Sequence, residues 1–123
     1  DNSLRNAKAA RKNAKIAGVE KQINFSRTEL EWLDIKFKKE SVDRIVTRLP
    51  ESKNTNLEKI YNEFFYQSEY ILKSKGSIAL ISRIPDVVKQ HAIKHNFIVS
   101  KEKSIWSGSE ELTLLLLKNV KNL

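Results

Sequence analysis

The stretch D-R-I-V-T-R-L-P-E-S, from Asp43 to Ser52, is an apolar segment that runs directly into a loop containing a proline. Val42 to Pro50 is typical of a β-strand that the proline ends, because proline cannot donate to a sheet ladder. In an open α/β sheet, ligands bind beyond the carboxyl ends of the strands. A loop held by a rigid proline at that edge could hold a planar group. A simple strand-ending turn is the alternative interpretation.

The residues after this loop alternate between helix and strand. Apolar residues at helical spacing predict a long amphipathic helix from Leu57 to Leu72, which Gly76 stops. Ser77 to Ile84 is a nearly continuous apolar run, as expected for a strand covered on both faces. Pro85 breaks that run, and Asp86 can cap the helix that follows.

Two further strands are expected at the carboxyl end of the chain, Phe97 to Trp106 and Glu111 to Lys118. The intervening Ser107-Gly108-Ser109 is a turn, so the two strands should form an antiparallel hairpin.

The residues before Asp43 predict one helix and one short strand. A helix is expected up to Ala17, because small and apolar residues recur at steps of three and four: Leu4, Ala7, Ala10, Ala14 and Ala17. Gly18 is its natural stop, and its alanines suggest close packing against a sheet. Its basic side chains are either an RNA-binding patch or, as we favour, an ordinary solvated face. Ile23 to Arg27 is a short strand candidate, and Thr28 to Lys39 a loop with a short helical turn.

The resulting order of strands and helices predicts a mostly parallel α/β sheet that ends in an antiparallel hairpin. The length of 123 residues allows one domain, covering residues 1–123. The net charge of +8 favours a polyanionic partner or simply keeps the chain in solution. The absence of cysteine excludes disulfides, thiol nucleophiles and cysteine-ligated metals. No membrane span or signal peptide is evident, so no membrane partner is expected. The chain opens at Asp1 and lacks methionine, so we expect it to be part of a longer protein.

Common catalytic motifs are missing from the sequence. It has no Walker loop, no G-x-G-x-x-G and no G-x-S-x-G, and its three glycines form no phosphate-cradling loop. His91 and His95 have a spacing that can place two imidazoles on one metal. No neighbour supplies a third ligand, so we expect a surface helix and no metal site. Glu110 and Glu111 are expected to be solvated charges at the hairpin turn.

Five segments occur in the order of a known family: A-R-K-N-A-K-I-A-G-V (Ala10–Val19), I-N-F (Ile23–Phe25), D-R-I-V-T-R-L-P (Asp43–Pro50), L-E-K-I-Y (Leu57–Tyr61) and L-K-S-K-G-S-I-A-L-I (Leu72–Ile81). Together they resemble the carboxyl two-thirds of the Rossmann-like S-adenosylmethionine-dependent methyltransferase domain. The most similar family is the THUMP-associated RNA methylases, which methylate the exocyclic amine of guanine in tRNA or rRNA. The resemblance covers essentially the whole chain. It implies a cytoplasmic RNA methyltransferase whose partners are RNA and a THUMP domain or upstream segment of the same protein.

The resemblance implies cofactor-binding residues at two positions. Asp1 falls where the family has the acid that binds the ribose hydroxyls of S-adenosylmethionine, and a carboxylate suits a diol because it accepts two hydrogen bonds. Glu29 falls where an aspartate contacts the adenine amine.

The catalytic T-N-L-P-Y loop of the family falls on Thr47, Arg48, Leu49, Pro50 and Glu51. In the family, the asparagine and a backbone carbonyl hold the target amine, while the aromatic residue stacks on the base. Here Arg48 replaces the asparagine and has no acceptor for an amine proton. Glu51 replaces the aromatic residue and offers no ring for stacking. Arg48 could still pair with RNA phosphate or a guanine edge.

The family's first strand and its glycine-rich loop would lie upstream of Asp1. We therefore expect a methyltransferase sheet that lacks its first strand and binds S-adenosylmethionine well only together with that loop. Two functions remain open: a fragment of an RNA methyltransferase, or a degenerate module that binds RNA or a partner without chemistry. An unrelated small α/β domain is a third possibility.

Overall fold

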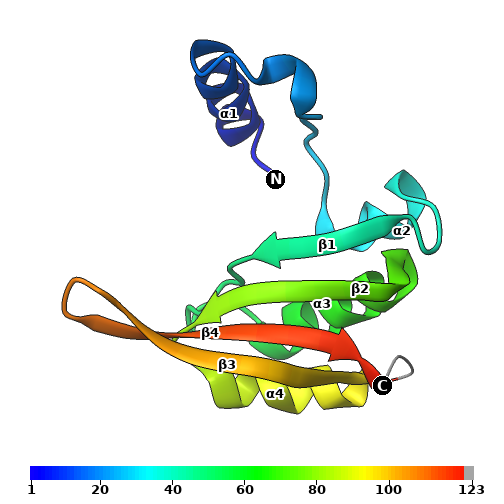
Figure 1. Cartoon of the computed structure of the whole chain (residues 1–123), viewed down its shortest axis with the longest axis vertical. Helices are drawn as coiled ribbons and strands as arrows, with labels where there is room; N and C mark the ends of the chain where they lie inside the picture. The colour runs from blue at the N-terminus through cyan, green and yellow to red at the C-terminus, as the bar shows by residue number, and fades with distance from the viewer. Residues whose placement is uncertain (121–123) are drawn as a thin grey trace.

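The computed structural model describes residues 1–120, and they fold around a four-stranded sheet with helices (Figure 1). The elements in chain order are α1 (Leu4–Ile16), η1 (Glu20–Gln22), η2 (Leu30–Trp32), α2 (Leu33–Lys36), β1 (Val42–Thr47), α3 (Leu57–Ile71), β2 (Leu72–Ser82), α4 (Pro85–Lys94), β3 (Phe97–Ser107) and β4 (Glu110–Asn119). Among these residues, no helix has both the length and the apolar character that crossing a membrane requires.

The strands lie in the order β1-β2-β4-β3. β1 pairs with β2 in parallel, while β4 is antiparallel to both β2 and β3. The expected α/β sheet and its carboxyl-terminal hairpin are thus confirmed. Within residues 1–120, however, only the β1–β2 pairing is parallel, so the described sheet is mixed and not mostly parallel. These two strands point the same way, so the segments that follow them meet at one edge of the sheet. In Figure 1 the tip of the β3–β4 hairpin projects past that edge.

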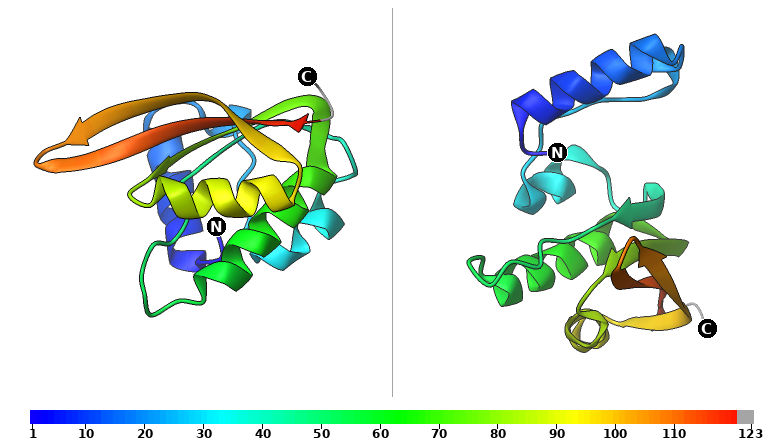
Figure 2. Two further views of the ribbon diagram at one scale, coloured as in Figure 1. Left: turned by 90° about the horizontal axis from the view of Figure 1, so that it is seen from below. Right: turned by 90° about the vertical axis from the view of Figure 1, so that its left-hand side faces the viewer.

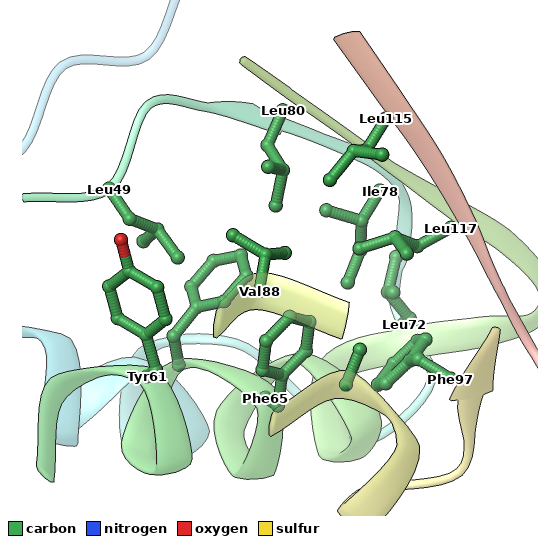
Figure 3. Packing of buried hydrophobic residues seen from close by; sticks show 12 residues of the cluster. Leu49, Tyr61, Phe65, Leu72, Ile78, Leu80, Val88, Phe97, Leu115 and Leu117 are labelled. Carbon is green, nitrogen blue, oxygen red and sulfur yellow. The ribbon is translucent and has the colours of Figure 1, made fainter. Parts of the chain in front are cut away.

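One face of the sheet packs against α3 and α4 (Figure 2, left). Apolar residues at alternate positions of β2 and β4 point to this face because successive side chains of a strand alternate. They meet the apolar stripes of the two helices in one core, shown in Figure 3, which contains Leu49, Tyr61, Phe64, Phe65, Leu72, Ile78, Leu80, Val88, Ala92, Phe97, Leu115 and Leu117. This core fixes the sheet edge to which the candidate site is attached.

The amino-terminal segment stands apart from the sheet, contrary to expectation (Figure 2, right). The strand predicted at Ile23 to Arg27 is absent, because no described strand lies beside it to accept its hydrogen bonds. α1 forms as predicted, and Gly18, at φ +76°, follows its end. The prediction that α1 packs against the sheet is wrong: Ala14 is its only buried residue, and Ile16 is 77% exposed.

Several element ends differ from the sequence prediction. β1 ends at Thr47 and not at Pro50, and β2 covers Leu72–Ser82 where a strand from Ser77 to Ile84 was expected. α3 ends at Ile71, and Gly76 lies inside β2 instead of stopping the helix. A Cβ on Gly76 would lie 2.9 Å from the Lys73 carbonyl oxygen and 3.1 Å from that of Asp43, so glycine is needed for close backbone approach. α4 begins at Pro85, which makes Asp86 a first-turn residue and not the cap. Proline suits this position because its fixed φ matches the helix and the missing N–H has no helical partner there.

Candidate functional site

The loop at the carboxyl end of β1 is held in place by the core. Leu49 is buried among the core residues, and the hydroxyl of Tyr61 donates to the carbonyl of Pro50 at 2.8 Å (Figure 3). Tyr61 itself is fully buried. Burial, with the negative charge of Glu51 nearby, raises the pKa of Tyr61 to about 12. The phenol is therefore a permanent donor at neutral pH, and the loop has a fixed backbone.

Four charged residues form a chain of ion pairs across this edge of the sheet. Arg48 Nε lies 3.3 Å from Oε1 of Glu51, and Arg83 Nε lies 3.2 Å from Oε2 of the same carboxylate. The backbone N–H of Arg83 also donates to Oε2, at 3.3 Å. Arg83 in turn pairs with Glu110 of the hairpin. Glu51, whose side chain is only 11% exposed, therefore lies between two guanidinium groups.

An open depression of about 670 Å³ lies over this ion-pair chain. Its lining contains four of the predicted catalytic residues, the next loop residue, the residue that follows β2 and the first residue of β4: Arg48, Leu49, Pro50, Glu51, Ser52, Arg83 and Glu110. The structure thus brings Arg48, Leu49, Pro50 and Glu51 together, and Thr47 is the last residue of β1. A depression of this volume can admit a ligand of nucleotide size.

The two predicted cofactor-binding residues lie in a second cluster. The backbone N–H of Thr28 donates to the carbonyl of Asp1 at 2.9 Å, which places Glu29 beside the start of the chain. The side-chain amide Nδ2 of Asn2 donates a hydrogen bond to Glu29 Oε2 at 3.4 Å. Asp1 and Glu29 are thus neighbours, as the resemblance implies. No hydrogen bond or ion pair within residues 1–120 joins them to the Thr47–Glu51 loop.

The geometry of Asp1 bears on whether S-adenosylmethionine fits this cluster. Its Oδ1 accepts from the Ser3 N–H at 2.8 Å and its Oδ2 from the Asn6 amide at 3.4 Å. Each carboxylate oxygen retains a lone pair for a ribose hydroxyl, and Asp1 is exposed. The Asp1 carboxylate can therefore accept hydrogen bonds from the ribose hydroxyls of the cofactor. The glycines, Gly18, Gly76 and Gly108, lie at a helix end, in a strand and at a hairpin turn, so the chain offers no glycine-rich loop for the methionine part.

His91 of α4 is buried against the core, contrary to the expected surface position, and His95, which follows the helix, is half-buried. His91 is 6% exposed, and its Nδ1 lies 2.9 Å from the Val87 carbonyl oxygen. Its ring meets Tyr61 edge-on, and His95 stacks on Phe65. The apolar residues of α3 cover both rings because α3 and α4 pack side by side. Within residues 1–120, no group of three His, Cys, Asp or Glu side chains could hold a metal ion.

Sequence reasoning missed two residues of the site, Arg83 and Glu110. Arg83 follows β2 directly, and the rule that ligands bind beyond the carboxyl ends of strands applies to it as much as to Arg48. Glu110 was expected to be a solvated turn residue. It instead pairs with Arg83 and is 39% exposed in its side chain.

The strand order, the parallel pair and the loop beyond it define a Rossmann-like methyltransferase fold, which solved structures share. TrmN from Thermus thermophilus superposes with a TM-score of 0.85 at 23% identity, covering 97% of this chain and 35% of that one. The ribosomal protein L11 methylase of Lactobacillus delbrueckii subsp. bulgaricus gives a TM-score of 0.72 at 18% identity, covering 97% of this chain and 55% of that one. The chain therefore spans little more than a third to a half of these proteins.

The family follows from the sequence match. Residues 1–110 match the model of UPF0020, the RMKL-like methyltransferase domain, and the chain belongs to that family. No curated protein matches it. The possibility of an unrelated small α/β domain is thereby excluded, and the expected resemblance to a methyltransferase domain of S-adenosylmethionine-dependent type is confirmed.

Proposed function

We propose that the chain is part of an S-adenosylmethionine-dependent RNA methyltransferase that acts on an exocyclic amine of guanine in tRNA or rRNA. The observation that carries this proposal is the Thr47–Glu51 loop, which the core holds at the carboxyl edge of β1 in a methyltransferase fold. The RNA specificity rests on the THUMP-associated pattern of motifs and on the net charge of +8. The fold relative TrmN is consistent with it. We place residues 1–123 in one partial domain of a cytoplasmic protein.

In this proposal each cluster has a separate task. Asp1 and Glu29 bind the ribose and adenine of S-adenosylmethionine, which supplies an electrophilic methyl group when bound. The Thr47–Glu51 loop would orient the target amine beside that methyl group, and the amine proton would have to pass to solvent when the methyl group is transferred. Arg48 has only donors, so it binds phosphate or the acceptor edge of guanine and does not take that proton. Because the loop lies at a sheet edge, the base must be single-stranded or flipped out to reach it.

The second candidate is a non-catalytic RNA-binding or partner module. The pairing of Arg48 with Glu51 favours it, since the position of the amine-binding asparagine is occupied by a cation that pairs with the chain's own carboxylate. Such a module would keep the fold and the basic surface without methyl transfer.

Labelled S-adenosylmethionine, incubated with tRNA or rRNA and the full-length protein that contains this chain, separates the two candidates. An enzyme incorporates label into RNA, and we expect Arg48→Ala to reduce incorporation about tenfold or more. Lys75→Ala, an exposed lysine in the amino-terminal half of β2, serves as the charge-matched control and should keep the wild-type rate. RNA binding without any incorporation would establish the non-catalytic module instead.

A further inference from the structure

The contacts of Glu51 are those of an anion bound in a site. Its two carboxylate oxygens face different guanidinium groups: Oε1 accepts a hydrogen bond from Arg48 Nε, and Oε2 forms an ion pair with Arg83 Nε. The backbone N–H of Arg83 adds a third donor at 3.3 Å. Two guanidinium groups and a backbone amide are the donors that proteins use to bind phosphate. The chain's own carboxylate therefore occupies a site that is built for an oxyanion.

The two arginines remain accessible although the carboxylate is not. The Arg48 and Arg83 side chains are 46% and 58% exposed, against 11% for Glu51. Both contacts with Glu51 are made through Nε, so the terminal Nη groups of the two arginines, which line the open depression, remain as possible phosphate donors. The same Nε of Arg83 also pairs with Glu110, so the second arginine is anchored to both the loop and the hairpin.

We infer that Arg48 and Arg83 form a clamp for a backbone phosphate of RNA, with Glu51 as the internal anion that the phosphate competes with. Arg83 is then a substrate-binding residue that the family motif does not contain. The clamp also gives Arg48 a task that does not require an acceptor atom. This inference rests on the proposed RNA substrate and adds the chemical group and the second residue that bind it.

The inference predicts that replacing Arg83 and replacing Glu51, two residues in contact, changes RNA affinity in opposite directions. Arg83→Gln removes one phosphate donor, so RNA affinity should fall about 3- to 10-fold. The slope of log affinity against log salt concentration should also become shallower, by about the contribution of one phosphate contact. Glu51→Gln removes the competing charge and frees both arginines, so RNA affinity should rise about 3- to 10-fold with a steeper salt dependence. A purely structural ion pair predicts a loss, or no change, for both variants.

The experiment is a fluorescence anisotropy titration of a labelled single-stranded oligoribonucleotide with the full-length protein at several salt concentrations. Lys75→Ala and Glu31→Gln are the matched controls, because both side chains are exposed and lie away from the depression. Circular dichroism melts establish that each variant is folded, and Arg83→Lys serves as a milder second variant. Inorganic phosphate as competitor distinguishes a phosphodiester site from one for free phosphate, which would be saturated at low millimolar competitor.

Opposite changes for Arg83→Gln and Glu51→Gln, beyond those of the controls, support the clamp. Unchanged affinity in both variants, or a loss in both, overturns it while leaving RNA methylation by the wild type intact. Saturation by inorganic phosphate also overturns it as an RNA site. Failure of the wild type to bind or methylate RNA overturns both the clamp and the proposed function.

Discussion

Gly76 is the glycine of the chain at which a side chain would meet the closest contacts. A Cβ there would lie 2.9 Å from Leu72 Cδ2 and from the Lys73 carbonyl oxygen. Since backbone atoms cannot move aside cheaply, Gly76→Ala should destabilise the fold by about 1–3 kcal/mol. Urea unfolding measures the change, and Ser74→Ala, an exposed position of the same strand, is the control. Equal stability of the two variants would show that β1 and β2 do not approach as closely as described.

The phenol of Tyr61 should make stability depend on alkaline pH. Its pKa is about 12 in the folded chain, raised by burial and then by Glu51, against about 10 when exposed to water. The folded state therefore holds this proton more tightly than the unfolded state does. The resulting stabilisation is fully present below pH 10 and is lost as pH rises from about 10 to 12, at up to about 1.4 kcal/mol per pH unit.

Tyr61→Phe tests this pH dependence. The variant should lose about 1–2 kcal/mol at neutral pH, because the Pro50 carbonyl loses its donor. The difference from the wild type should then shrink between pH 10 and 12, as measured by urea unfolding at each pH. Comparing the two proteins removes the contribution of every group that they share. A difference that stays constant over this range would contradict the assigned pKa.

At the scale of the elements, one buried side chain joins the segment from η2 to α2 to helix α3. Gln67 is 1% exposed, and its Oε1 accepts from the Asp34 N–H at 2.8 Å. Its Nε2 donates to the Glu31 carbonyl at 3.1 Å and to Glu63 at 2.9 Å. Gln67→Leu removes the partner of these part-buried groups, which should cost about 1–2 kcal/mol.

Hydrogen exchange shows which part of the chain the Gln67→Leu substitution destabilises. Exchange at residues 30–36 should accelerate in Gln67→Leu, while the strands β2 and β4 keep their relative protection. Gln90→Leu, an exposed position on α4, provides the matched control. If exchange accelerated only in the sheet, the hydrogen bonds of Gln67 would not be what holds residues 30–36 against α3.

Which elements were predictable from sequence depends on where their partners lie. The long α3, β2 and the β3–β4 hairpin were predicted because their apolar patterns match the core that residues 57–120 form among themselves. The strand at Ile23 was wrong because a strand needs a neighbour, and local sequence does not say whether one is present. The start of β2 at Leu72 was missed for a related reason: pairing with Val42, and not the local pattern, makes residues 72–76 extended.

The candidate site was predictable in part for the same reason. Motif order predicted Thr47–Glu51, Asp1 and Glu29 as site residues, and the structure brings Arg48, Leu49, Pro50 and Glu51 together at one depression. The ion-pair chain was not predictable, because Arg83 and Glu110 join Glu51 only through the strand order β1-β2-β4. Contacts between distant segments set this chemistry, and spacing along the chain does not encode them.

For the molecule as a whole, the amino-terminal segment should be less stable than the sheet. α1 buries only Ala14, and short hydrogen-bonded contacts with residues 26–28 tie Asp1 and Asn2 in place. In the 123-residue chain, amides of α1 should therefore exchange through local opening, at rates far above those of β2 and β4. Native-state hydrogen exchange measures this, and equal protection of α1 and the sheet would contradict the separation seen in Figure 2.

The central claim is that the loop beyond β1 serves methyl transfer to an exocyclic amine of guanine in RNA. Nucleoside analysis by mass spectrometry, after incubation of the full-length protein with RNA and S-adenosylmethionine, tests it most directly. The account predicts N2-methylguanosine with the wild type and a loss of about tenfold or more with Arg48→Ala. Methylation at any other atom, or an N2-methylguanosine yield that Arg48→Ala leaves unchanged, would contradict it.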